Sequence, residues 1–124
     1  MNTQALHGLY ALTDTMLLPG EKLLAGVTAA IRGGARLVQY RDKSVDQVRR
    51  EREARALLAL CREHEIRLII NDDITLAQTI GADGVHLGRD DVALEQARVR
   101  LGPHALIGVS CYDSLQRAID AAHA

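Results

Sequence analysis

The segment LVQYRDKS, residues 37–44, ends an apolar run with charged and polar side chains. Because successive side chains of a strand point to opposite faces, Gln39, Arg41 and Lys43 share one face if the extended backbone continues past Tyr40. Two cations and an amide on one face are suited to binding an anion. The alternative is that Arg41 and Lys43 are solvated loop charges, which is the usual environment of these residue types.

Polar residues also follow the other apolar runs of the chain. They are Thr13, Asp14, Asn71, Asp72, Asp73, Arg89, Asp90, Asp91 and Ser110. In parallel α/β proteins, catalytic groups gather at the carboxyl ends of the strands. Each aspartate taken singly has an alternative role, because Asp is also a preferred N-cap of the helix that follows.

Carboxylates after two strands, beside Arg, Lys, Asn and Ser, favour a Mg²⁺–diphosphate site. Mg²⁺ takes oxygen ligands and commonly uses one or two carboxylates together with substrate phosphates. Arginine and lysine then neutralise the remaining phosphate charge. His86 lies within an apolar run, so we interpret it as a hydrogen-bonded interior histidine rather than a catalytic one. Cys111, next to Ser110, is interpreted either as a packing residue or as a residue that supports the side chains of the site without reacting.

Strands and helices are expected to alternate strictly along the chain. Strands are expected at residues 9–13, 36–40, 67–71, 83–88 and 106–110, with amphipathic helices between them. The longest helix is expected to begin with a capping box of Ser44 and Gln47, and to place Val48, Leu57 and Cys61 on its apolar stripe. This alternation predicts a parallel sheet. The pattern alone leaves a doubly wound sheet and a (β/α)₈ barrel open, although neither nucleotide-binding glycine motif is present.

The composition narrows the class of protein. The chain has 124 residues, 48% of them hydrophobic and 25% charged, which is typical of one soluble globular domain. A formal net charge of −1, with three tyrosines as the only aromatic residues, argues against nucleic-acid binding. No apolar run approaches the roughly 20 residues of a membrane span. The absence of metal-type spacing between Cys61 and Cys111 favours free thiols in a cytoplasmic protein.

Five motifs together resemble those of thiamine-phosphate synthase, also called thiamine-phosphate pyrophosphorylase. They are LYALTD, LVQYRDKS, LIINDD, GADGVHLGRDD and IGVSCYDS, and they extend over essentially the whole chain. The resemblance implies a (β/α)₈ TIM barrel and a transferase of thiamine biosynthesis. Its substrates would be hydroxymethylpyrimidine diphosphate and a thiazole phosphate, and its products thiamine monophosphate and diphosphate.

The resemblance also implies roles for individual residues. Contacts to the pyrimidine diphosphate are expected from Gln39, Arg41, Lys43, Asn71 and Ser110, with Arg41, Lys43 and Ser110 acting in catalysis. Asp72 and Asp91 are expected to hold Mg²⁺. The related thiazole tautomerase, an isomerase of the same fold, is the alternative. The two carboxylates favour the synthase, because the isomerase has no evident use for a metal–diphosphate site.

The family's chains are longer than this sequence. We therefore expect only about the first five βα units of the barrel, forming a single partial domain over residues 1–124. Such a piece would expose its first and fifth strands, so we expect a homo-oligomer that hides these edges. We also expect little or no activity from this chain alone. A further alternative is a non-catalytic fragment that only binds ligand or self-associates.

Overall fold

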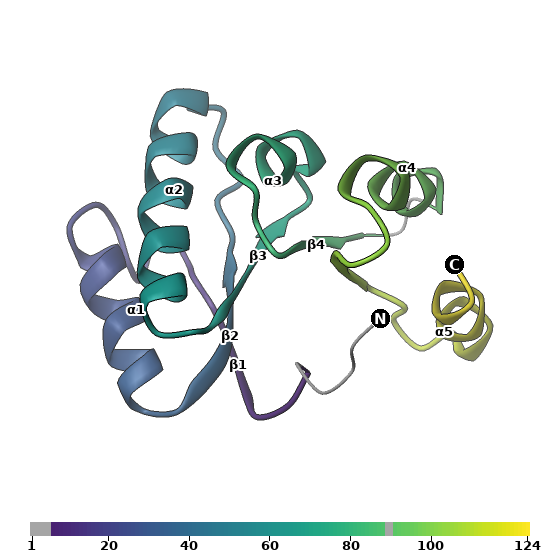
Figure 1. Cartoon of the computed structure of the whole chain (residues 1–124), viewed down its shortest axis with the longest axis horizontal. Coiled ribbons are helices and arrows are strands. Elements are labelled where there is room, and N and C mark those ends of the chain that lie inside the picture. Colours follow the sequence, from purple (N-terminus) through teal and green to yellow (C-terminus); the bar gives the residue numbers. More distant parts are fainter. Residues whose placement is uncertain (1–5, 89–90) are drawn as a thin grey trace.

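A single parallel sheet carries the fold in the computed structural model, which describes residues 6–88 and 91–124 (Figure 1). Strands and helices alternate in the order β1 (Leu9–Leu12), α1 (Lys22–Arg32), β2 (Ala35–Tyr40), α2 (Gln47–Glu63), β3 (Arg67–Asn71), α3 (Ile74–Ile80), β4 (Gly84–Leu87), α4 (Asp91–Leu101), β5 (Leu106–Val109) and α5 (Leu115–Ala122). The expected strands are thus confirmed to within one or two residues at each end.

The strand order decides between the two candidate architectures. Neighbours in the sheet are neighbours in the sequence, β1-β2-β3-β4-β5, and every pair is parallel. Figure 1 shows the helices following one another along the outer side of the curved sheet. A doubly wound sheet would reverse its strand order and carry helices on both faces. The described residues instead form five consecutive βα units of a partial (β/α)₈ barrel.

The two faces of the sheet differ in packing. The face toward the helices holds the main core, which includes Val38, Leu57, Leu68, Ile70, Cys61 and Val85. The opposite face, which lines the inside of the curve, carries a small cluster of Leu37, Ile69 and Leu106. Alternation along each strand therefore places Gln39, Asn71 and His86 on the inner side, next to these three residues.

The start of α2 differs from the expected capping box. Asp46 is the N-cap, and its carboxylate accepts the Arg49 N–H at 3.1 Å. Ser44 lies two residues earlier, and its hydroxyl accepts from the Arg49 guanidinium at 2.7 Å. The expected apolar stripe is also wrong in its first turn, where Val48 is 77% exposed, whereas Leu57 and Cys61 are fully buried.

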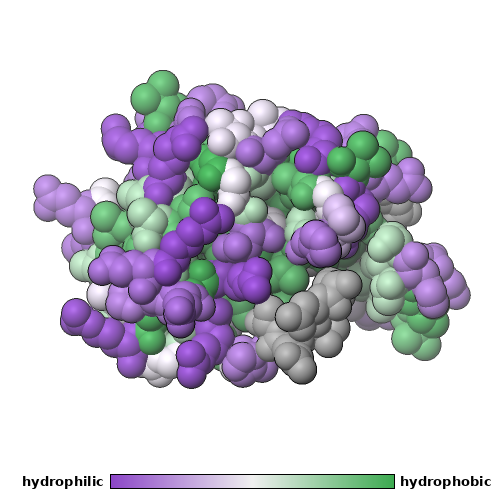
Figure 2. Space-filling model, in the orientation of Figure 1, coloured by the Kyte–Doolittle hydropathy of each residue, from purple (hydrophilic) through white to green (hydrophobic). Residues whose placement is uncertain are grey.

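The outer surface is largely polar, but apolar side chains are exposed on several elements, among them Val48 on α2 and Val99 on α4. Figure 2 shows hydrophilic side chains spread over the face formed by α1 and α2. At the other end of the sheet, α5 buries none of its residues, and Leu115 and Ile119 are exposed. None of the described helices combines the length and the apolar character needed to cross a membrane.

Candidate active site

The carboxyl end of β2 presents the predicted anion-binding residues in two different environments. Gln39 is buried, and its amide donates to the Tyr10 hydroxyl of β1 at 2.9 Å. Arg41 and Lys43 are exposed, and neither side chain forms a hydrogen bond or ion pair with another described residue. β2 itself ends at Tyr40. The shared exposure of Arg41 and Lys43 therefore comes from the shape of the following loop, and not from a longer strand.

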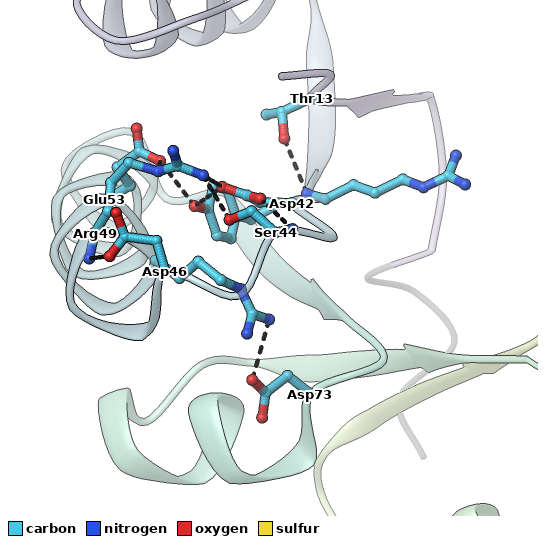
Figure 3. Close-up of polar contacts among 10 residues, drawn as sticks. Thr13, Asp42, Ser44, Asp46, Arg49, Glu53 and Asp73 are labelled. Atoms are coloured by element: carbon cyan, nitrogen blue, oxygen red, sulfur yellow. Dashed lines mark hydrogen bonds and ion pairs between the residues drawn. The ribbon is translucent and has the colours of Figure 1, made fainter. Parts of the chain in front are cut away.

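Asp42 lies between these two cations and is buried. Its carboxylate accepts the Ser44 N–H at 2.8 Å and pairs with the Arg49 guanidinium of α2. Burial opposes ionisation of Asp42, but the Ser44 and Arg49 donors outweigh it and lower the pKa of this carboxyl. On the other side of the loop, the Thr13 hydroxyl accepts the Arg41 N–H at 2.9 Å (Figure 3).

The three polar residues that end β3 are divided between structure and site. Asp73 caps α3 by accepting the Leu76 N–H at 2.9 Å, and it pairs with Arg50 at 3.0 Å. Asp72 is exposed, and its carboxylate accepts a hydrogen bond from the Asn71 amide at 3.2 Å. Capping is thus confirmed for Asp73, while the Asp72 carboxylate keeps oxygen lone pairs for a ligand.

His86 and Ser110 meet across β4 and the end of β5. The ring Nε2 of His86 lies 3.0 Å from the Ser110 hydroxyl oxygen, which confirms a hydrogen-bonded interior histidine. Burial lowers the pKa of His86; the Asp72 charge raises it and the Arg41 charge lowers it. Parallel pairing in the order β2, β3, β4, β5 brings the carboxyl ends of these strands to one edge of the sheet, where His86 and Ser110 are in contact. The ring is neutral near pH 7.

Gly108 makes room for this histidine. A Cβ atom at Gly108 would lie 2.5 Å from His86 Nδ1, so a larger residue would displace the ring. Neither this requirement nor the contacts of Tyr10 and Arg49 were predicted from the sequence. A glycine inside an expected strand is the signal that was available for Gly108.

The expected metal ligands are only partly described. Asp72 directly follows β3 and is exposed, but the side chain of Asp91, which begins α4, lies outside the described residues. Within residues 6–88 and 91–124, no cluster of three or more His, Cys, Asp and Glu side chains is suited to a metal ion. The Cys111 thiol donates to the Val109 carbonyl oxygen at 3.5 Å, in keeping with a packing role.

Comparison with known proteins gives the family. Residues 9–124 match the family model described as thiamine monophosphate synthase. The chain belongs to the thiamine monophosphate synthase family. Thiamine-phosphate synthase of Nitrosococcus oceani is 51% identical over 122 residues, which are 98% of this chain and 56% of that protein. Thiamine-phosphate synthase of Chromobacterium violaceum is 54% identical over 112 residues, which are 90% of this chain and 54% of that protein.

A solved structure supports the same membership at the level of the fold. Thiamine phosphate pyrophosphorylase from Pyrococcus furiosus superposes with a TM-score of 0.84 and 32% sequence identity, covering 98% of this chain and 58% of that one. The family resemblance carried by the five motifs is therefore confirmed. This member of the thiamine monophosphate synthase family spans just over half the length of the curated relatives that it matches.

Proposed function

We propose that this chain carries the pyrimidine diphosphate site of a thiamine-phosphate synthase. The observation that carries the proposal is the pair of exposed cations, Arg41 and Lys43, that follow β2. Asp72 follows the adjacent strand β3, and the His86–Ser110 pair comes from β4 and the end of β5, at the same end of the parallel sheet. The 51% identity to a thiamine-phosphate synthase supports the choice of substrate. The second substrate would be a thiazole phosphate, and the products would be thiamine monophosphate and diphosphate.

The proposed reaction replaces a C–O bond by a C–N bond. The bond between the pyrimidine methylene carbon and diphosphate breaks, and its electron pair leaves with the diphosphate. The thiazole nitrogen lone pair then forms the new bond to that carbon. Arg41 and Lys43 act most strongly on the leaving oxygens, because negative charge grows there as the bond breaks. Gln39, Asn71 and Ser110 supply hydrogen bonds that orient the bound substrate.

We also propose a Mg²⁺ ion held by Asp72, with Asp91 as the second carboxylate. The donor set fits, because the Asp72 carboxylate is exposed, belongs to none of the described ion pairs, and lies next to the Asn71 amide. Mg²⁺ ordinarily combines one or two carboxylates with water and substrate phosphates, and so does not require a cage of protein ligands. Bound there, it would neutralise diphosphate charge. The role of Asp91 remains a prediction.

The assignment of Arg41 and Lys43 to diphosphate is tested by measuring diphosphate affinity with titration calorimetry, in the presence and absence of Mg²⁺. Arg41→Met and Lys43→Met should each weaken binding by at least about tenfold, because each removes a charge-assisted hydrogen bond. Arg36→Met is the matched control, since Arg36 is an exposed cation on the same strand outside the proposed site. Equal affinity of the Arg41 and Arg36 variants would refute the site.

The metal assignment has its own test. Asp72→Asn should abolish the increase in diphosphate affinity that Mg²⁺ produces, while leaving metal-free binding equal or tighter because a negative charge is removed. Asp120→Asn, at an exposed position on α5, controls for the change in net charge. A Mg²⁺ effect that survives Asp72→Asn would show that the ion lies elsewhere.

We further propose that copies of the chain associate through the open edges of the sheet. Strand β1 pairs only with β2, and β5 only with β4, within the described residues. Large apolar side chains are exposed beside both edges of the sheet. Leu9 and Leu12 on β1 are 60% and 51% exposed, and Leu115 and Ile119 are exposed on α5, which follows β5. Unpaired strands with apolar side chains readily pair with another chain.

A further inference from the structure

Asp42 is a carboxylate in an unexpected place for an anion-binding loop. It stands between the two cations proposed to bind diphosphate, and it is only 5% exposed. By Coulomb's law, a negative charge at this position opposes the binding of a phosphate group. The position of Asp42 between Arg41 and Lys43 is therefore explained by its contacts and not by its charge.

The contacts of Asp42 tie the loop to the start of α2. One oxygen accepts the Ser44 N–H at 2.8 Å, which closes a tight turn of the backbone across Lys43. The other oxygen accepts from the Arg49 guanidinium, and the same guanidinium donates to the Ser44 hydroxyl at 2.7 Å. Arg49 therefore holds both ends of this turn (Figure 3).

Arg49 is in turn held by the core side of the sheet. Glu53, one turn further along α2, lies 3.5 Å from Arg49 and accepts the Tyr40 hydroxyl at 2.9 Å. Tyr40 is 2% exposed and belongs to the main core. Contacts thus run from Tyr40 of β2 to Asp42 in the loop both directly, through a 3.3 Å hydrogen bond from the Tyr40 hydroxyl, and through Glu53 and Arg49.

A second anchor acts from the neighbouring strand. The Thr13 hydroxyl, buried at the end of β1, accepts the Arg41 N–H at 2.9 Å. The backbone at Arg41 is therefore fixed from one side and the turn at Lys43 from the other. Exposed lysine and arginine side chains lose considerable conformational freedom on binding a ligand, and a fixed backbone reduces that cost.

We propose that Asp42 is a positioning residue, which acts through Arg49 to hold the backbone of Arg41 and Lys43 in the conformation that binds diphosphate. This inference rests on the proposed function, because it assumes that these two cations bind diphosphate. Asp42 does not touch the ligand. Its negative charge is offset by Arg49, so the loop gains a rigid turn without a net loss of positive potential.

The charge and positioning explanations predict opposite signs for Asp42→Asn. Removing a negative charge should tighten diphosphate binding if charge alone matters, whereas loss of the Arg49 pairing should weaken it by roughly tenfold if Asp42 positions the loop. Asp46→Asn is the matched control, because it removes a charge two residues after Ser44, and asparagine is also a good N-cap. Its affinity should be unchanged or slightly higher.

Two further variants separate positioning from general stability. Asp42→Glu keeps the charge but changes its reach, so it should weaken binding even if Asp42→Asn fails to fold. Arg49→Gln should weaken binding as Asp42→Asn does, and the double variant should lose less affinity than the sum of the two single losses, because both single variants remove the same Asp42–Arg49 contact. Thermal unfolding of each variant identifies the temperature range in which affinities are compared between folded proteins.

The outcomes of diphosphate titration with Mg²⁺ are distinct. Weaker binding by the Asp42 and Arg49 variants, with unchanged binding by Asp46→Asn, supports the proposal. Normal or tighter binding by Asp42→Asn or by Asp42→Glu, in a protein whose affinity still depends on Arg41, overturns the proposal and leaves the proposed function intact. Absence of diphosphate binding by the unaltered chain refutes both.

Discussion

At the scale of single residues, the pKa of His86 depends on the charged side chains of the site. His86 bonds to Ser110, and its pKa responds to Asp72 in one direction and to Arg41 in the other. These are the groups proposed to bind Mg²⁺ and diphosphate. A measured pKa of His86 therefore tests whether Asp72 and Arg41 lie close to this imidazole.

We expect His86 to titrate below its ordinary pKa of 6.5, because burial disfavours the imidazolium. Asp72→Asn should lower this pKa further, and Arg41→Met should raise it, since each variant removes the corresponding charge effect. Titration of the imidazole signals by NMR, with the urea-unfolded chain as reference, gives the values. Shifts of the same sign in both variants would contradict the geometry.

The same pKa has a consequence for stability. In the unfolded chain, His86 binds a proton near pH 6.5, but in the folded protein it does so only at lower pH. The neutral, buried imidazole therefore contributes its full stability above about pH 6.5, and the contribution is lost as the pH falls through the folded value. Chemical denaturation between pH 7 and 5 should show less loss of stability for His86→Asn than for the unaltered chain.

At the scale of elements, the pairing of β4 with β5 depends on a glycine. Gly84 stands opposite Leu106, and a Cβ atom there would lie 1.9 Å from the Leu106 carbonyl oxygen. That atom belongs to the backbone, so a larger residue must push the strands apart. The Ser110 hydroxyl reaches His86 only because these two strands lie close together.

Gly84→Ala should therefore destabilise the protein by about 1–3 kcal/mol, the usual cost of overpacking, and should break the His86–Ser110 bond. Urea denaturation measures the first effect and the His86 pKa measures the second. Gly88→Ala is the matched control, because a Cβ atom at Gly88 meets nothing within 4 Å. If both alanine variants are equally stable, the close approach of β4 and β5 is refuted.

At the scale of the whole molecule, the sheet formed by the described residues has two open edges, and apolar side chains are exposed beside them. A closed barrel has no such edges, and its inner face is covered on all sides. In this chain, the inner cluster of Leu37, Ile69 and Leu106 faces a hollow that is also lined by Tyr10 and His86. The edges and the hollow together favour association with a further polypeptide.

We expect the purified chain to form a dimer at micromolar concentration, as measured by sedimentation equilibrium or light scattering. Leu12→Lys, which places a charge on the β1 edge, should shift the equilibrium toward the monomer. Val48→Lys serves as the control, since Val48 is also an exposed apolar residue but lies on α2, away from the β1 edge. A folded monomer at this concentration would rule out the proposed association.

We also expect the chain alone to make little thiamine monophosphate. It matches 56% of the thiamine-phosphate synthase of Nitrosococcus oceani. We expect the thiazole phosphate site to lie in the remaining part of that relative, which has no counterpart in these 124 residues. Correct placement of two reactants is worth roughly 7–11 kcal/mol of barrier, and much of this is lost when one reactant is unheld. Separate assays of thiamine monophosphate and of free diphosphate measure how much of the substrate is coupled. Formation of thiamine monophosphate at the rate of a complete synthase would contradict the prediction.

Local pattern in the sequence determined the elements and the family. Apolar runs ending in Asn71 or Ser110, separated by amphipathic stretches, located every strand to within two residues. The motifs around Arg41, Asp72 and His86 also identified the family, because they preserve chemistry at strand ends and do not depend on how distant segments pack. The predicted roles of Gln39, Lys43 and Asp91 rest on the same motifs.

Only the tertiary structure decided how these elements combine. The choice between a barrel and a doubly wound sheet rests on strand order, which local periodicity does not encode. The Gln39–Tyr10 and His86–Ser110 contacts join residues 29 and 24 positions apart, and strand register brings them together. The predicted capping box at Ser44 was wrong for a related reason. Asp46 caps α2, while the Ser44 hydroxyl accepts a hydrogen bond from the Arg49 guanidinium. Competition among nearby polar groups is settled by three-dimensional geometry, because several local bonds are individually of similar strength.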